Sequence, residues 1–97
     1  MKHEALIQEL QEVASQLGVT IRYERGDFEG GYCILREEKI LLVNRRLFPA
    51  KKASVLAMAM HEIGLEDMYL KPAVREYIED EIARAARTRS DQPGNRP

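Results

Sequence analysis

Hydrophobic residues recur along the first quarter of this chain with two different periods. Leu6, Leu10, Val13 and Leu17 are separated by four, three and four positions, which places them on one face of a helix. We predict that this helix spans residues 2–17 and ends where Gly18 can adopt a left-handed conformation. From residue 19 to residue 24, apolar and polar residues alternate, which predicts a strand with one buried face.

Two further strands are predicted after a glycine-rich segment at residues 26–31. Because this segment leads into a strand and not into a helix, it is typical of a hairpin loop and not of a phosphate-binding loop. The predicted strands are residues 32–36 and 39–44, joined by a short polar turn. The second of them contains the unbroken apolar run Ile40–Val43, which favours burial on both faces. We expect the three strands to form an antiparallel meander.

The second half of the chain predicts two helices. The first begins at Pro49 and ends at Gly64, and its apolar residues occupy most of its circumference, so we expect it to be central and buried. The second begins near Pro72, and its inward stripe is predicted to comprise Val74, Tyr77, Ile78, Ile82 and Ala85. The fold class is therefore α+β with two layers, in the order α-β-β-β-α-α, the meander being covered by helices. Residues 1–87 form the single domain, and residues 88–97 are expected to be a disordered tail.

Composition narrows the class of protein. The chain has 97 residues, with 15 Lys and Arg against 16 Asp and Glu, and 44% of its residues are hydrophobic. It is too apolar for a disordered protein and too evenly charged for a general polyanion binder. One cysteine cannot form an intramolecular disulfide, and no apolar run is long enough to span a membrane. The first residues become acidic too early for a signal peptide, so we expect a cytoplasmic protein without membrane contact.

One segment suggests chemistry. His61-Glu62-Ile63-Gly64-Leu65 follows the H-E-x-x-H pattern of zinc peptidases up to its last position, where Leu65 replaces the second histidine. Together with a strand that ends in Asn44, the segment resembles the core of small bacterial zinc metallopeptidases of the ImmA/IrrE type, which cleave repressor proteins. The resemblance covers about residues 19–65. It implies that His61 matches the first zinc ligand and Glu62 the general base.

The missing ligand changes what this resemblance implies. Leu65 cannot bind a metal, and neither His3 nor Cys33 has a recognisable spacing to His61. If the kinship is real, the chain is a peptidase scaffold that has lost hydrolysis, with His61 and Glu62 as vestiges. If it is not, the pair occurs by chance and His61 is solvated or hydrogen-bonded. In both cases we expect no catalytic residue, no metal and no cofactor.

A basic cluster offers a different interpretation. Arg45, Arg46, Lys51 and Lys52 flank Phe48, which is predicted to be exposed, and residues 22–52 carry eight basic and five acidic side chains. Such a cluster is able to hold phosphates or an acidic partner. A solvated charged face explains it equally well, and no known nucleic-acid module has this order of elements. Nucleic acid is therefore not a favoured partner.

The remaining candidates have structural explanations. Cys33 has no predicted neighbouring base, so we expect a small buried hydrophobe, and Phe28 is expected to fold back onto the sheet. The apolar strand and the apolar helix together offer more apolar surface than one small domain covers. We therefore expect a non-enzymatic interaction or regulatory domain that forms a homodimer or binds another protein. The alternatives are the inactive peptidase-like domain and the basic-cluster binder.

Overall fold

The order of elements is the predicted one. The computed structural model describes residues 1–91, and side chains as far as Thr88. Its elements are α1 (His3–Gln16), β1 (Val19–Glu24), β2 (Gly30–Leu35), β3 (Glu38–Asn44), α2 (Pro49–Ile63) and α3 (Pro72–Asp91). The fold class, α+β in the order α-β-β-β-α-α, is confirmed. Helix α3 continues past the expected domain boundary at residue 87, and residues 92–97 of the expected tail lie outside the described residues.

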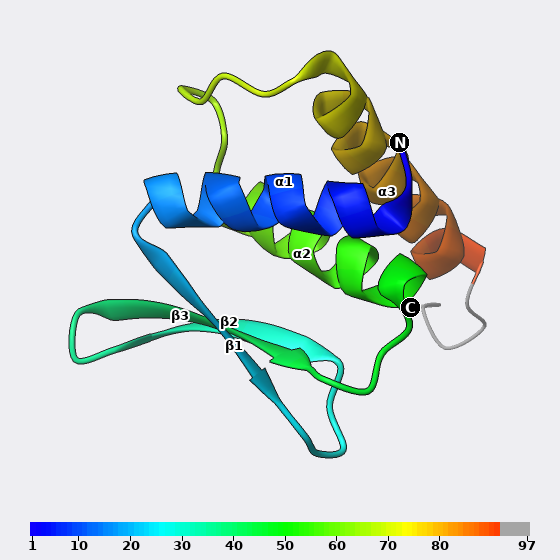
Figure 1. Ribbon diagram of the computed structural model, residues 1–97. Helices are drawn as coiled ribbons and strands as arrows, with labels where there is room; N and C mark the ends of the chain where they lie inside the picture. The colour runs from blue at the N-terminus through cyan, green and yellow to red at the C-terminus, as the bar shows by residue number, and fades with distance from the viewer. Residues whose placement is uncertain (92–97) are drawn as a thin grey trace.

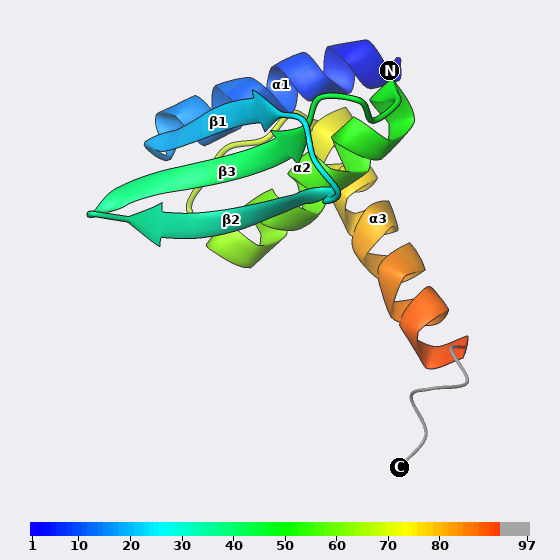
Figure 2. The same ribbon diagram turned by 90° about the horizontal axis from the view of Figure 1, so that it is seen from below.

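The sheet is mixed, so the prediction of a purely antiparallel meander is wrong. Its strand order is β1-β3-β2, with β3 in the centre. β1 runs parallel to β3, with Ile21 opposite Leu41, whereas β2 runs antiparallel to β3, with Tyr32 opposite Leu41. Figure 2 shows β3 lying between its two neighbours across the uncovered side of the sheet. β2 is therefore an edge strand and not the middle strand that a meander would make it.

The difference has a physical origin in β3 and in the loop at residues 25–29. β3 contains the most apolar run of the three strands, and a central position protects it on both edges. The loop from β1 to β2 passes the end of β3, where the Asn44 amide donates to the Glu29 carbonyl at 2.8 Å. On the other side, the Arg45 amide donates to the Glu24 carbonyl at 2.8 Å. Both neighbouring strands are thus bonded to the end of β3 and not to each other.

All three helices lie on one face of the sheet (Figure 1). The core between the two layers contains fully buried side chains from α1, β3, α2 and α3, among them Leu10, Leu41, Val43, Leu56, Met60 and Val74. Helix α2 contacts α1, α3, β2 and β3, which confirms its prediction as the central helix. Among residues 1–91, no helix covers the other face of the sheet, so the expectation that β3 is covered on both faces is wrong. Ile40 is buried on that face without a helix over it, and Leu42 is half-buried.

The boundaries of α2 follow from two residues that disfavour its continuation. Phe48 is extended, with φ −66° and ψ 156° in the range that a residue before proline prefers, and Pro49 begins the helix. Gly64 ends it with φ 105°, a conformation that side chains rarely adopt. Of the helices within residues 1–91, none combines the length and the apolar composition that crossing a membrane requires.

Candidate functional site

The outer edge of β2 is the feature of this fold that is most open to a partner. The register places Glu29 opposite Asn44, and the bond from the Asn44 amide shows that the Glu29 carbonyl points toward β3. Because the direction alternates along a strand, the amides and carbonyls of Gly30, Tyr32 and Ile34 point away from β3. These backbone groups form a row that a further strand can pair with.

The side chains of β2 carry no charge and do not cover the backbone groups at its outer edge. The sequence of β2 is Gly-Gly-Tyr-Cys-Ile-Leu, in which Tyr32 is half-buried and the other five residues are exposed. Ile34 and Leu35 expose 63% and 58% of their surface, so the strand ends in two neighbouring exposed aliphatic side chains. Cys33 is a free thiol and is exposed, so its prediction as a buried residue is wrong. The cause is the strand order, because an edge position leaves Cys33 with a neighbouring strand on one side instead of two.

A groove runs between β2 and α2. We call it the β2–α2 groove, and it has a volume of about 430 Å³ with a mixed polar and apolar lining: Glu29, Gly30, Gly31, Tyr32, Leu41, Lys51, Ser54, Val55, Met58, Ala59, His61, Glu62 and Ala85. At one end, Lys51 Nζ lies 3.3 Å from Glu29 Oε2. Near it, a Cβ at Gly30 would lie 2.7 Å from Val55 Cγ1 and 2.7 Å from the Leu42 carbonyl oxygen. The absence of a side chain at Gly30 is therefore what lets β2 approach α2 closely.

Asn44 fixes the loop that leads into β2. Its side-chain amide donates to the carbonyls of Gly26 at 2.9 Å and Phe28 at 2.6 Å, and its Oδ1 accepts from the Arg46 amide at 2.9 Å. Asn44 is itself buried. The ring of Phe28 is half-buried and lies over Gly26, a residue of the same loop. These bonds determine where β2 begins relative to β3.

The structure separates the parts of the zinc-peptidase pattern. His61 and Glu62 are both exposed, in the last turn of α2, and both line the β2–α2 groove. The helix ends at Gly64, so Leu65 lies beyond it and packs against the hydrophobic core. The spacing that aims two side chains of one helix at a single ion is therefore not formed between positions 61 and 65. Within residues 1–91, no three His, Cys, Asp or Glu side chains are grouped closely enough to hold a metal.

The basic cluster is divided between two sides of α2. Lys51 faces Glu29 in the β2–α2 groove, whereas Lys52 Nζ lies 5.6 Å from the centre of the Tyr23 ring. Arg45 lines a hollow with Lys52 and Tyr23, at the side of α1. Phe48 is 82% exposed, as expected. The predicted cations thus do not form one continuous basic surface.

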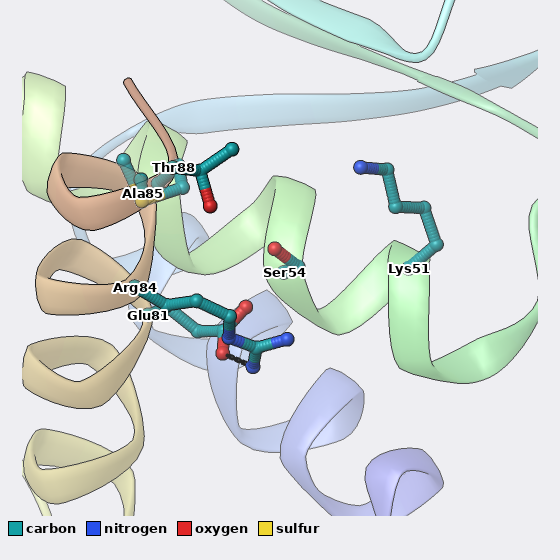
Figure 3. A pocket seen from close by; sticks show the side chains of 7 residues that line it. Lys51, Ser54, Glu81, Arg84, Ala85 and Thr88 are labelled. Atoms are coloured by element: carbon teal, nitrogen blue, oxygen red, sulfur yellow. Dashed lines mark hydrogen bonds and ion pairs between the residues drawn. The ribbon is translucent and has the colours of Figure 1, made fainter. Parts of the chain in front are cut away.

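A further pocket lies between α2 and α3 (Figure 3). Its most buried polar residue is Glu81, which is 5% exposed and pairs with the guanidinium of Arg84 one helical turn later. Lys51 and Ser54 line the opposite wall on α2. Since the buried carboxylate already has a cationic partner, this pocket does not present an uncompensated charge to a ligand.

Sequence reasoning missed the β2 edge because the predicted meander placed β2 between two other strands. A usable signal was present, since the unbroken apolar run of β3 marks it as the best candidate for the centre of the sheet. Placing β3 in the centre makes β1 and β2 the edges, and of these two only β2 lacks charged residues.

Comparison of the chain with protein-family models, with curated proteins and with solved structures finds no significant match.

Proposed function

We propose that this chain is a cytoplasmic, non-enzymatic interaction domain that binds its partner by accepting a strand at the outer edge of β2. The observation that carries the proposal is the unprotected edge itself. Every second residue of the strand faces outward, and these three residues present backbone donors and acceptors in a segment without charge: Gly30, Tyr32 and Ile34. Strand addition to an exposed sheet edge is an established mode of peptide recognition.

The absence of protection supports this proposal. Soluble proteins usually block an edge strand with charges, proline, a bulge or a covering element, because an open edge invites association. β2 contains no charged residue and no proline within Gly30–Leu35, and its two most C-terminal side chains are aliphatic and exposed. The lining of the β2–α2 groove beside it includes the apolar side chains of Val55, Met58 and Ala59. Alternate side chains of an added strand would point into this groove and determine specificity.

Selection from a displayed library of random peptides tests the proposal. We expect enrichment of extended peptides with alternating apolar residues, whose binding is lost when Ile34 is replaced by lysine. N-methylation of alternate amides in a selected peptide should abolish binding, and methylation of the intervening amides should not, because strand pairing uses every second residue. A library that yields no binder sensitive to Ile34→Lys would refute the proposal.

A degenerate peptidase-like domain is a second candidate, and one observation favours it. His61 and Glu62, the two residues that the resemblance singles out, both line the groove beside β2. A domain that retained zinc binding would gain thermal stability on addition of Zn²⁺, and His61→Ala would remove that gain. An unchanged unfolding temperature with Zn²⁺ would reject the zinc-binding form of this candidate while leaving strand addition unaffected.

A further inference from the structure

We infer that the strand accepted at the β2 edge is β2 of a second copy of this chain, paired antiparallel about a two-fold axis that passes beside Cys33. This inference rests on the proposed function and names its partner. The result would be a continuous six-stranded sheet in which the two copies use the same surface.

The direction of the backbone groups limits the possible registers. Hydrogen-bonded pairs in the new ladder must join outward-facing residues of both copies, which are Gly30, Tyr32 and Ile34. Two symmetric arrangements with substantial overlap satisfy this condition. In one arrangement, Tyr32 lies opposite Tyr32 of the second copy. In the other, Cys33 lies opposite Cys33 of the second copy.

The side chains favour the arrangement centred on Cys33. It pairs Tyr32 with Ile34 of the second copy, an aromatic residue with a β-branched one, twice by symmetry. It also sets Leu35 opposite Gly31, where a Cβ would have no heavy atom within 4 Å and space is therefore open. The arrangement centred on Tyr32 would instead set the exposed Leu35 opposite the charged Glu29.

The ends of the paired segment are compatible in charge. Antiparallel pairing brings Arg36 of one copy opposite Gly30 of the other, next to Glu29. Lys51 lies 3.3 Å from Glu29, and Glu37 follows Arg36, so each end of the interface gathers two cations and two anions. A parallel arrangement would place Glu29 beside Glu29, with like charges repelling.

The size of the contact sets the expected affinity. Pairing over the few residues of one short strand buries less surface than the roughly 1,200–2,000 Å² of a stable complex. We therefore expect a reversible dimer with a dissociation constant of the order of 10 µM. Ile34 and Leu35, which are exposed in the monomer, would each gain a cross-strand neighbour in the second copy.

Sedimentation equilibrium of the full chain provides the first test, over concentrations from about 2 to about 500 µM. The wild type should pass from monomer to dimer, and Ile34→Lys should weaken the dimer by more than about tenfold, since a buried charge at the edge opposes pairing. Tyr69→Lys is the matched control, because Tyr69 is an apolar side chain 82% exposed outside the sheet, and it should dimerise like the wild type. A dimer that Ile34→Lys leaves intact would overturn the inference.

Oxidation of the dimer with diamide tests the register. In a non-hydrogen-bonded antiparallel pair the Cα atoms are about 4.5 Å apart, within the range of a disulfide. Cys33 should therefore cross-link two copies in high yield. In the control Cys33→Ser/Leu35→Cys, the two thiols lie four residues out of register and should not cross-link. If the dimer forms but only the control cross-links, or if neither does, the register centred on Cys33 is wrong.

The two sets of experiments separate the inference from the proposed function. A chain that stays monomeric at about 500 µM and still binds strand-like peptides would overturn self-pairing and retain strand addition. A chain that stays monomeric and binds no such peptide would overturn both. Circular dichroism of Ile34→Lys, expected to match the wild type because Ile34 is exposed in the monomer, shows whether a lost dimer reflects the edge and not unfolding.

Discussion

The two edges of this small sheet are built from strands of equal length and differ in almost everything else. β1 alternates apolar residues with Thr20, Arg22 and Glu24, and the last two form an ion pair at 3.2 Å. β2 contains no charged residue and exposes Ile34 and Leu35. β1 is also joined to α1, because the Tyr23 hydroxyl donates to the Gln11 side chain. One edge is thus charged and tied to a helix, whereas the other is left in a condition that favours association.

The open edge is therefore a local feature of β2 and not a general property of a small sheet. The same protein has the means to protect an edge and uses them on β1. Substitutions in the loops and turns that hold β2 in place should therefore change the two edges most.

The largest expected effect comes from the residue that joins the two edges. Asn44→Ala removes the donors to Gly26 and Phe28 and the acceptor for the Arg46 amide. We expect a loss of about 2–3 kcal/mol in the free energy of unfolding, because buried polar groups are left without partners. Urea denaturation measures the loss. Asn44→Asp keeps the acceptor but turns a carboxylate oxygen toward the two carbonyls, so it should lose at least as much as Asn44→Ala. A stability of Asn44→Asp close to that of the wild type would show that the amide donors do not matter.

Two neighbouring glycines should behave in opposite ways. Gly30→Ala places a methyl group 2.7 Å from Val55 on α2 and should cost about 1–2 kcal/mol, because β2 and α2 must move apart. Gly31→Ala meets open space and should stay within about 0.5 kcal/mol of the wild type. Urea denaturation at low micromolar concentration compares the two. Similar losses at both positions would mean that β2 does not lie close to α2.

The turn between β2 and β3 predicts a gain in stability. Arg36 and Glu37 both have positive φ, 52° and 69°, the pattern of a two-residue hairpin turn for which Asn-Gly is favoured. The double variant Arg36→Asn/Glu37→Gly should raise the free energy of unfolding by about 1 kcal/mol, since side chains are strained in this region. The single variant Arg36→Asn should give a smaller gain. A decrease in thermal stability for the double variant would argue against this turn.

The smallest effect concerns the protected edge at high pH. Burial raises the pKa of the Tyr23 hydroxyl above its ordinary value of 10.0. The folded state therefore holds this proton more tightly than the unfolded state, and the associated stability is present below pH 10 and lost as the pH rises further. Tyr23→Phe should lose less stability than the wild type between about pH 10 and pH 11 in thermal unfolding. Tyr77→Phe is the comparison, because burial raises the pKa of Tyr77 in the same way. Parallel pH profiles of wild type and Tyr23→Phe would contradict this reasoning.

The sequence predicted the elements well, because each has a local cause. Proline at position 49 and glycine at position 64 limit α2 to within one residue of its predicted range, and the spacing of Leu6, Leu10 and Val13 defines α1. The order of the strands has no such local cause, because a period of two reveals which face is buried and not which strand lies alongside. The meander was predicted from chain order alone, and the bonds from Asn44 and Arg45 to the loop and to β1 produce a different order.

The candidate site was harder to predict for the same reason. Cys33 was expected to be a small buried hydrophobe because no base was predicted beside it, and its exposure follows from the edge position of β2, which the predicted meander did not give. The sequence alone shows that Leu65 replaces the second histidine of the zinc-peptidase pattern that begins at His61. Only the structure shows that the helix ends at Gly64 and that Leu65 packs against the hydrophobic core. The excess of apolar surface was expected on the strand at residues 39–44 and the helix at residues 49–64, but most of their apolar side chains are buried, and the exposed aliphatic pair Ile34 and Leu35 lies on β2.

Amide hydrogen exchange at two protein concentrations shows whether β2 alone pairs with a second copy, because it compares the two edges in a single sample. The amides of Tyr32 and Ile34 face outward from β2, and those of Ile21 and Tyr23 face outward from β1. Between about 5 and about 500 µM, exchange at Tyr32 and Ile34 should slow about sixfold as the second copy pairs with β2, because a dissociation constant of about 10 µM lowers the fraction of free edges by that factor. Exchange at Ile21 and Tyr23 should not change. Equal rates at both concentrations for Tyr32 and Ile34, or slowing confined to Ile21 and Tyr23, would contradict the account.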